Sequence, residues 1–418
     1  MDHSVLFVIG ACCVGFIMTW GVGANDLANI LSTTLGSKAV TVRQAMLIAI
    51  VFEFAGALLG SSGVSNTISN GILHTDVLAN TPNILAYGMM AVLLAGSSWM
   101  LLASYFGLPV SITNAIVGSL VGFGAVVLGM HAIVWPHVRA IAISWLISPF
   151  LAGVAAYLLF RSVQRTILMT VNPLENAQRY LPLYFFLVGI VLAFMTVLKA
   201  IKHFEFAALT FWESCLVVIA TSFFITGIGL WLSRRISLEP DATGHDRFAA
   251  VERLFSLLMA FTACAMVFAH GSNDVAVAVG PIAAIINIAQ SNDHIIHGGH
   301  LPFEIILLGI CGVLTGLFMY GRKVIETVGR GITTLTPSRA FAATLSAAAT
   351  VIVSTSIGIP VSATQTLVGG VLGVGLARGI GALNLYVVRN ILLSWLITIP
   401  AASVLAILFY YLLVNVFK

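Results

Sequence analysis

The sequence predicts an all-α integral membrane protein, and three observations predict that class. Of the 418 residues, 59% are hydrophobic and 8% are charged, whereas a soluble domain carries roughly a quarter charged residues. The apolar runs are continuous and near helix-spanning length, which excludes a transmembrane barrel built from short alternating strands. The 38 glycines are typical of helices that pack closely in lipid.

The first five membrane elements follow from the apolar runs. The first is expected to be interrupted near 21–26, where Gly, Asn and Asp stand within the run. The fourth begins after GLPVS, because Gly107 and Pro109 end the helix before it. Arg139 leads the fifth. These elements are expected at 4–35, 43–63, 84–106, 109–129 and 138–160.

Seven further elements complete a predicted total of about twelve. Two of them, 181–198 and 207–232, lie between halves of similar length. The element at 254–290 is expected to be interrupted near 271–274, as the first is near its Asn-Asp pair. The remaining elements are expected at 303–321, 339–357, 359–380 and 384–416.

The two halves of the chain repeat the same order of motifs. GLPVSITNAIVGSLVGFG matches GIPVSATQTLVGGVLGVG at nine of eighteen positions, and VRAIAISWLI matches VRNILLSWLI at seven of ten. An Asn-Asp pair precedes both matches at a similar offset. We therefore expect a first repeat over 1–160, two linking helices and a cytoplasmic loop over 161–253, and a second repeat over 254–418.

The distribution of basic residues predicts opposite orientations for the two repeats. We place the N- and C-termini outside and let each Gly-x-Pro-Val-Ser segment form a re-entrant hairpin. Fifteen of the nineteen Lys and Arg residues then fall in cytoplasmic segments, as the positive-inside rule requires. Inverted-topology repeats are typical of secondary transporters. The cytoplasmic segments are 36–43, 161–180, 233–253, 322–339 and 378–389.

Two aspartates, Asp26 and Asp274, are expected within the membrane, each preceded by an asparagine, Asn25 or Asn273. A charged side chain there costs roughly 2.5–3.5 kcal/mol on insertion scales. A buried aspartate that caps a helix after a break is the structural alternative. The duplication favours a binding site. Since neither motif contains Lys or Arg, we expect a bound cation or a proton to neutralise the carboxylates.

The two Gly-x-Pro-Val-Ser segments are expected to form the other part of the site. Each stops one helix and begins another among hydroxyl and amide side chains. The free N–H groups and the positive dipole end of the new helix favour an anion. A polar kink, in which Ser and Thr only satisfy the backbone, is the alternative. The candidate residues are Ser111, Thr113, Asn114, Ser362, Thr364 and Gln365.

A site with carboxylates, two helix N-termini and no basic residue suggests that an anion and a cation bind together, as in symport. Phosphate is favoured over sulfate, because phosphate near neutral pH carries protons that it can donate to a carboxylate. A symporter of another tetrahedral oxyanion, sulfate above all, is the close alternative. An anion channel is disfavoured, because anion pores use rings of Arg or Lys.

An enzyme is also disfavoured. The chain has no His-Glu-x-x-His zinc motif, no Gly-x-Ser-x-Gly elbow and no cofactor fingerprint. Two intramembrane aspartates would suit an aspartyl protease only if they were close enough to share a proton. We expect no cofactor and no nucleic-acid partner. The expected environment is the lipid bilayer of a bacterial inner membrane, and a homodimer is one assembly we consider.

The motifs GANDLANILSTTLGSKAVT and GSNDVAVAVGP resemble the paired Gly-x-Asn-Asp signatures of the inorganic phosphate transporter (PiT) family. FEFAGALLG and the two Gly-x-Pro-Val-Ser segments fall where that family has them, and the resemblance covers essentially the whole chain. It implies a phosphate symporter with twelve membrane helices and a midway site. The Asn-Asp pairs would match the broken-helix half of that site, and the Ser, Thr, Asn and Gln candidates the re-entrant half.

One departure from the family bears on the coupling ion. Many relatives carry His where Asn114 and Gln365 stand. Because Asn and Gln do not titrate, these positions cannot relay protons in this chain. Sodium is therefore favoured over a proton as the coupling cation, although Asp26 or Asp274 could itself carry a proton.

Glu53, within IVFEFAGALLG, is a third candidate ligand of the coupling cation, beside Asp26 and Asp274. A glutamate bonded to a neighbouring helix is the structural alternative. Its counterpart in the second repeat depends on the register. Aligning the glycines places Gly309 opposite Glu53, whereas the offset of the other motifs places Glu304 there.

Overall fold

The computed structural model describes residues 2–74, 82–203, 210–236, 244–290, 302–322, 324–325 and 332–417. Over these residues the regular structure is helical, apart from one isolated β-bridge between Leu73 and Ile133. The predicted class, an all-α membrane protein, is confirmed.

The first half of the chain forms helices that alternate with π-helical turns and one short 3-10 turn, η5. Their bounds are α1 (Asp2–Val22), η1 (Gly23–Leu27), α2 (Ala28–Gly36), α3 (Val42–Ile48), η2 (Ala49–Glu53), α4 (Phe54–Gly60), α5 (Ser62–Asn70), α6 (Pro82–Phe106), α7 (Ile112–Phe123), η4 (Gly124–Leu128), η5 (Met130–Ala132), α8 (Trp135–Val163) and η6 (Gln164–Leu168).

The second half continues in the same way, with a 3-10 turn at η8. The bounds are α9 (Pro173–His203), α10 (Phe211–Ser233), α11 (Gly244–His270), η7 (Gly271–Val275), α12 (Ala276–Gln290), α13 (Phe303–Tyr320), α15 (Pro337–Ser356), α16 (Ala363–Arg378), η8 (Ile380–Ala382) and α17 (Leu385–Val416).

Each of the twelve predicted segments overlaps a helix, but several boundaries were wrong. α9 begins at Pro173 rather than 181, α11 begins at Gly244 rather than 254, and the helix of α8 and η6 runs to Leu168 rather than 160. The physical reason is that hydropathy marks the lipid-facing part of a helix, and a helix continues beyond it. Among the described residues, nine helices are long and apolar enough to cross a membrane. The count of twelve crossings and the inversion of the repeats stay predictions.

The interruptions expected near 21–26 and 271–274 are not breaks, and this is a correction. At η1 and η7 the chain makes one π-helical turn, and the flanking residues Val22 and Ala276 keep right-handed helical dihedral angles. A π turn keeps the backbone hydrogen-bonded within the helix while it widens one turn, as an apolar environment requires. The polar pairs therefore sit on continuous helices.

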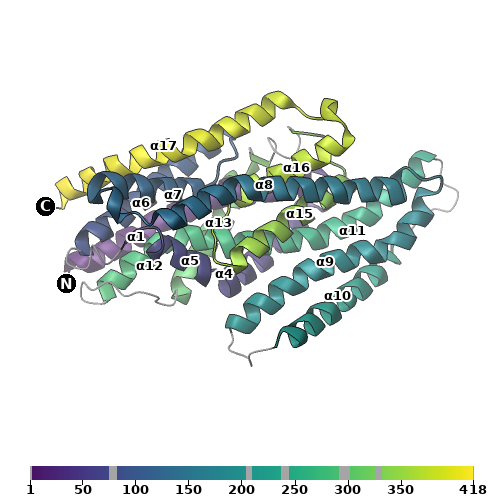
Figure 1. The fold of residues 1–418 in the computed structure, drawn as a ribbon, viewed down its shortest axis with the longest axis horizontal. Coiled ribbons are helices and arrows are strands. Elements are labelled where there is room, and N and C mark those ends of the chain that lie inside the picture. The colour runs from purple at the N-terminus through teal and green to yellow at the C-terminus, as the bar shows by residue number, and fades with distance from the viewer. Residues whose placement is uncertain are drawn as a thin grey trace.

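Short helices of each half pack against long helices of the other half. α16 lies along α8, and α7 lies along α17 (Figure 1). Both pairs approach closely at glycines, because a Cβ at Gly369 would overlap the carbonyl oxygen of Pro149, and one at Gly118 would press on that of Ile399. This packing of each short helix against the other half brings the start of α7 and the start of α16 into the same region.

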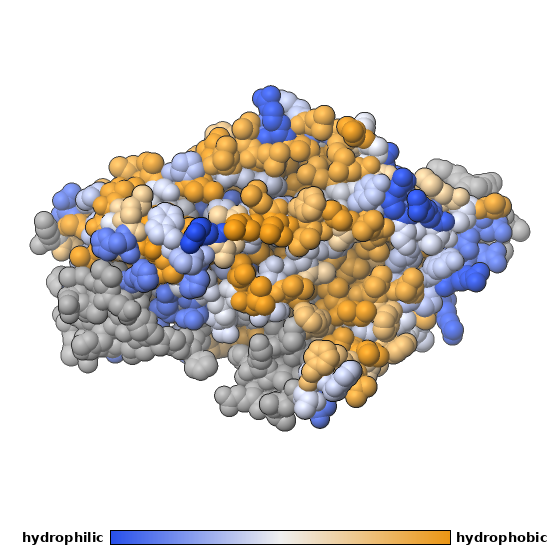
Figure 2. Space-filling model, in the orientation of Figure 1, coloured by the Kyte–Doolittle hydropathy of each residue, from blue (hydrophilic) through white to orange (hydrophobic). Residues whose placement is uncertain are grey.

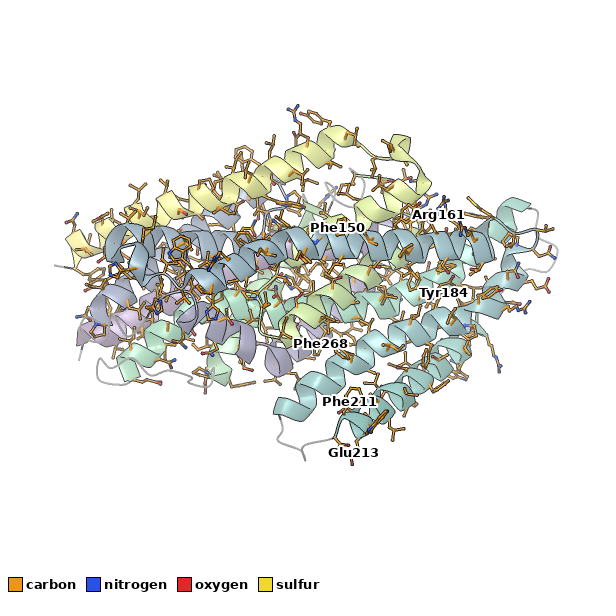
Figure 3. All side chains as sticks on the ribbon, in the orientation of Figure 1. Phe150, Arg161, Tyr184, Phe211, Glu213 and Phe268 are labelled. Atoms are coloured by element: carbon orange, nitrogen blue, oxygen red, sulfur yellow. The ribbon has the colours of Figure 1, made fainter. Side chains whose placement is uncertain are left out.

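The surface and the outermost hairpin fit a protein surrounded by lipid. Hydrophobic residues cover most of the middle of the visible face, and hydrophilic residues gather mainly toward its two ends (Figure 2). α9 and α10 pair at the edge of the bundle (Figure 1). Glu213 lies at the outer end of α10 (Figure 3), where it completes a capping box with Thr210. Its role is therefore structural.

Candidate functional site

The ten residues predicted from the repeated motifs are all buried. They lie on four segments: the π turns η1 and η7, and the first turns of α7 and α16 with their N-caps. The residues are Asn25, Asp26, Ser111, Thr113, Asn114, Asn273, Asp274, Ser362, Thr364 and Gln365. Hydrogen bonds join these segments to one another across up to 338 residues of sequence.

The two asparagines hold the turns that precede the short helices. Asn25 Nδ2 donates to the carbonyl oxygen of Leu108 (2.9 Å), and Asn25 Oδ1 accepts from the N–H of Val110 (3.0 Å). Asn273 makes the corresponding pair with one residue, Val361: its Nδ2 donates to the carbonyl (2.7 Å) and its Oδ1 accepts from the N–H (3.3 Å). Each asparagine thus fixes the turn before a short helix to a π turn of its own half.

Ser111 and Ser362 are N-caps. Both have extended backbone angles, and their hydroxyls accept from the N–H groups of Asn114 (3.3 Å) and Gln365 (3.1 Å). An N-cap of this kind satisfies one free donor of the helix start and leaves others. Helix capping therefore accounts for the presence of the two serine hydroxyls, without any bound ligand. The first-turn N–H groups of Thr113, Ala363 and Thr364 have no acceptor among the described residues.

Asp26 bridges the two short helices. Its Oδ2 accepts from the N–H of Ile112 at the start of α7 (3.2 Å), and its Oδ1 accepts from the hydroxyl of Thr364 on α16 (2.6 Å). The carboxylate therefore lies where the positive end of the α7 dipole favours a negative charge. Thr113, the counterpart of Thr364, donates instead to the carbonyl of Val361 (2.9 Å).

Asp274 has a partner that the sequence reasoning missed, His270. The ring atom Nε2 lies 3.2 Å from Asp274 Oδ2, four residues further along the helix, although the two atoms are not aligned as a hydrogen bond. The other ring nitrogen, Nδ1, lies 2.7 Å from Glu53 Oε1 on η2. All three side chains are buried. His270 is neither Lys nor Arg, the two residue types expected to neutralise a carboxylate, but its spacing of four residues from Asp274 on a helix was a signal in the sequence.

Close packing settles the register around Glu53, and both proposed counterparts were wrong. A Cβ at Gly271 would overlap the carbonyl oxygen of Glu53, and a Cβ at Gly23 would overlap that of Val313. Because Gly23 and Gly271 are equivalent positions, Val313 is the counterpart of Glu53, rather than Gly309 or Glu304. Sequence alone could not decide this, since helix packing and not motif spacing sets the register.

The two halves of the site are therefore chemically different. The offset that relates Asn25 to Asn273 places Val22 opposite His270. Asp274 has His270 of its own half and Glu53 of the first half nearby, whereas the equivalent positions around Asp26 are Val22 of its own half and Val313 of the second half. Of the two aspartates, Asp274 alone has an imidazole in contact among the described residues.

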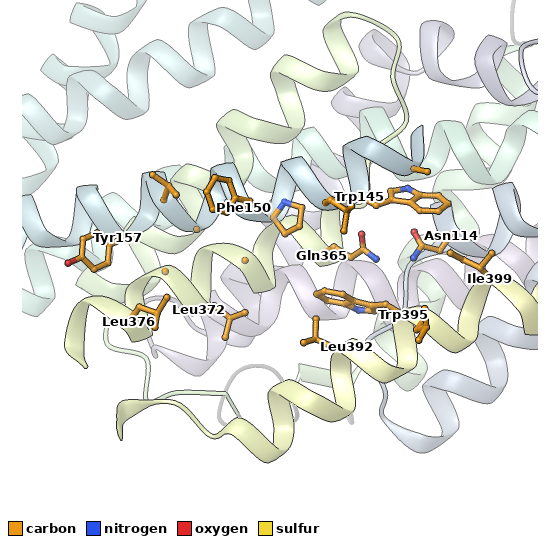
Figure 4. A pocket seen from close by; sticks show the side chains of 18 of the residues that line it. Asn114, Trp145, Phe150, Tyr157, Gln365, Leu372, Leu376, Leu392, Trp395 and Ile399 are labelled. Carbon is orange, nitrogen blue, oxygen red and sulfur yellow. The ribbon is translucent and has the colours of Figure 1, made fainter. Parts of the chain in front are cut away.

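Asn114 and Gln365 line a cavity of about 770 Å³ between α8, α16 and α17. Their amides lie between the rings of Trp145 and Trp395 (Figure 4). The amide oxygens of both residues are buried and find no hydrogen-bond partner in the part of the chain that the structure describes. Most of the other lining residues are Leu, Phe, Gly and Val, so this space is not a path for a hydrated anion.

No group of three or more His, Cys, Asp or Glu side chains arranged for a metal ion occurs in the part of the chain that the structure describes. The Asp26 carboxylate and the Thr364 hydroxyl that donates to it supply oxygen atoms at the site. Hard cations such as Na⁺ are bound by oxygen ligands of this kind. Glu53 connects to Asp274 through His270, so its place in a cation site remains a prediction.

A bundle of membrane helices that encloses a polar site between two helix starts defines a membrane transporter. The model of the phosphate transporter family matches residues 22–406. The chain belongs to the phosphate transporter family. Its members among the relatives below are named as transporters and permeases, not enzymes.

Three relatives illustrate the similarity. A Haemophilus influenzae protein named "Putative phosphate permease" is 43% identical over 407 residues, with 97% of this chain and 96% of that protein covered. "Inorganic phosphate transporter 2-1, chloroplastic" of Arabidopsis thaliana is 38% identical over 421 residues, with 96% and 71% covered. A solved structure, "The sodium-dependent phosphate transporter", has a TM-score of 0.89 at 38% identity and covers 98% of this chain and 99% of its own.

Proposed function

We propose that this protein imports inorganic phosphate by symport with sodium, through alternating access around the site between η1, η7, α7 and α16. Asp26, Asp274 and the first turns of the two short helices bind the anion and the cation together. A proton is the alternative coupling ion.

One observation carries the proposal: Asp26 is held between the starts of α7 and α16 by Ile112 and Thr364. Helix N-termini attract a phosphate anion, whereas a buried carboxylate repels it. A cation bound at the carboxylate removes the repulsion and adds attraction for phosphate. The same geometry therefore makes each ion favour the binding of the other.

Two features favour sodium over a proton. The amides of Asn114 and Gln365, which stand one residue beyond the threonines Thr113 and Thr364, do not titrate. The similar solved structure is named as sodium-dependent. The buried contact between His270 and Asp274 joins Asp274 to a group that can carry a proton, so the proton alternative also has to be tested.

Alternating access follows from the repeat. Each half contributes one π turn and one helix start, so motion of one half against the other can expose the site to either side. With the orientation predicted from the basic residues, the termini lie outside and the membrane is the inner membrane of a bacterium.

The test is uptake of radiolabelled phosphate into proteoliposomes that contain the full-length protein. An inward sodium gradient is imposed at equal pH on both sides, and parallel vesicles receive a pH gradient without sodium. Excess sulfate serves as competitor. We expect uptake that requires sodium and ignores sulfate. Uptake driven only by the pH gradient would replace sodium by a proton, and competition by sulfate would overturn phosphate as the substrate.

A further inference from the structure

The Ser-Trp pair of the repeated SWLI segment reaches a re-entrant turn in one half of the protein. On α17, Trp395 Nε1 donates to the carbonyl oxygen of Pro109 (3.1 Å), and Ser394 Oγ lies 3.4 Å from the same atom. Both side chains are buried. Pro109 lies two residues before the N-cap of α7, so this contact fixes the turn that positions α7.

The equivalent pair on α8 makes no such contact. Trp145 Nε1 is buried and has no hydrogen-bond partner among the described residues, where Ser144 Oγ donates only to the carbonyl of Ile141 (2.6 Å) in its own helix. No described side chain donates to the carbonyl of Pro360, the counterpart of Pro109. The second turn is held elsewhere, because Thr67 Oγ1 on α5 donates to the carbonyl of Gly358 (2.8 Å).

A buried indole N–H without an acceptor is costly, since it has lost its hydrogen bond to water and gained none. The chain has a tryptophan at this position in both halves, within segments that match at seven of ten residues. The indole N–H of Trp395 has an acceptor, and no described residue accepts from the indole N–H of Trp145. This difference is what two halves of a transporter would show if they exchanged conformations.

We propose that Trp145 and Trp395 are positioning residues that hold the two re-entrant turns in alternation. In the state described here, Trp395 holds the turn at Pro109 and Trp145 is released. In the opposite state, Trp145 donates to the carbonyl of Pro360 and Trp395 is released. The inference rests on the proposed alternating access and adds the residues that distinguish its two states.

The cavity gives this exchange its space. Trp145 and Trp395 lie on opposite sides of the Asn114 and Gln365 amides, within the cavity lining (Figure 4). Both rings therefore border unfilled volume, which gives each of them room to change its position. Each turn carries the N-cap of one short helix, so releasing one turn frees one half of the phosphate site.

The test observes the indole N–H groups directly. Full-length protein in lipid nanodiscs is labelled with ¹⁵N-tryptophan, and resonances are assigned by single Trp→Phe variants, which remove the N–H and keep an aromatic ring. In the wild-type protein we expect a bonded Trp395 signal and a mainly unbonded Trp145 signal. Because one hydrogen bond is worth about 0.5–1.5 kcal/mol net, W395F should raise the bonded fraction of Trp145 by roughly two- to tenfold.

Transport supplies the second readout. W145F and W395F each remove the hydrogen bond that stabilises one state, so each should slow phosphate uptake. The double variant destabilises both states alike, so its uptake should be faster than that of the slower single variant. Trp212, exposed on α10, gives the control W212F, which should change neither readout. If W395F does not fold, Ser394→Ala weakens the same contact.

Two results would overturn the proposal: a Trp145 signal unchanged in W395F, or single-variant losses that add in the double variant as a merely structural role predicts. The failure of this proposal is distinguishable from failure of the proposed function. Wild-type uptake of phosphate depends on no assumption about the tryptophans, and the indole signals depend on no assumption about the coupling ion.

Discussion

At the scale of single residues, the two aspartates have equivalent positions and different partners. Asp26 accepts from a backbone N–H and a hydroxyl, both neutral. Asp274 accepts from the Asn273 amide and faces His270. A buried charge is tolerated when it is paired or coordinates a cation. No Lys, Arg or His among the described residues contacts Asp26, so Asp26 has the greater need of a bound ion.

We predict that Asp26→Asn and Asp274→Asn each reduce sodium-dependent uptake by roughly 10- to 100-fold. The change keeps the side-chain volume and removes the charge, and hydrogen bonds to a charged group contribute about 1.5–3 kcal/mol. Initial rates in proteoliposomes at equal reconstituted protein give the measurement. Glu213→Gln, at the exposed start of α10, is the control with the same chemistry. Robust uptake by Asp26→Ala or Asp274→Ala would remove these residues from the site.

The Glu53–His270 contact makes a separate prediction about stability. Removing one partner of a buried hydrogen-bonded pair leaves the other without a partner, at a cost of roughly 3–5 kcal/mol when the group is charged. We expect Glu53→Gln and His270→Gln each to lower the thermal midpoint in detergent. The double variant should lose less than the sum of the single variants, because neither partner is then left alone. Additive losses would mean that the 2.7 Å contact contributes no coupling.

At the scale of elements, the sequence predicted where helices lie better than how they end. The twelve apolar runs form helices because about twenty apolar residues in lipid must satisfy their backbone hydrogen bonds within the segment, which a helix does. The start of α9 at Pro173 was missed because its first turns are polar. The π turns were missed because Gly next to Asn and Asp also suits a break, and only the packed neighbours distinguish the two.

Glycines fix the distance between the π turns and their neighbouring helices. A Cβ at Gly23 would overlap the backbone of Val313, and a Cβ at Gly316 would overlap that of Trp20. We therefore predict that Gly23→Ala and Gly316→Ala lower the free energy of unfolding by at least about 1–3 kcal/mol, the usual cost of overpacking.

The comparison is made with Gly227→Ala on α10, where a Cβ would meet nothing within 4 Å. That variant should be as stable as wild type or slightly more stable, because Ala is the better helix former. Thermal unfolding followed by size-exclusion chromatography of the three variants gives the ranking. Equal midpoints for Gly23→Ala and Gly227→Ala would contradict the close packing of η1 on α13.

At the scale of the whole molecule, duplication made the site predictable. Asp26 and Asp274 could be recognised because carboxylates are rare in apolar runs. Two of them at equivalent positions of the two repeats indicate a function. His270 and Val313 could not be placed in this way, because each breaks the repeat. The spacing of His270 and Asp274 was visible in the sequence, but only the structure shows that Glu53 contacts His270 and that Val313 takes the equivalent place in the other half. This asymmetry is the part of the site that concerns the proposed coupling ion.

The last prediction concerns the coupling between phosphate and the sodium ion that we propose as its co-substrate. If phosphate and sodium share one site, each must raise the affinity for the other by the same factor. We expect saturating sodium to lower the Kd of phosphate roughly 5- to 150-fold, and saturating phosphate to lower the Kd of sodium equally. Calorimetry on the full-length protein, with choline replacing sodium at constant ionic strength, measures both factors. Asp26→Asn should abolish the coupling and Glu213→Gln should keep it. A coupling that survives Asp26→Asn would place the cation away from the carboxylate that bridges α7 and α16.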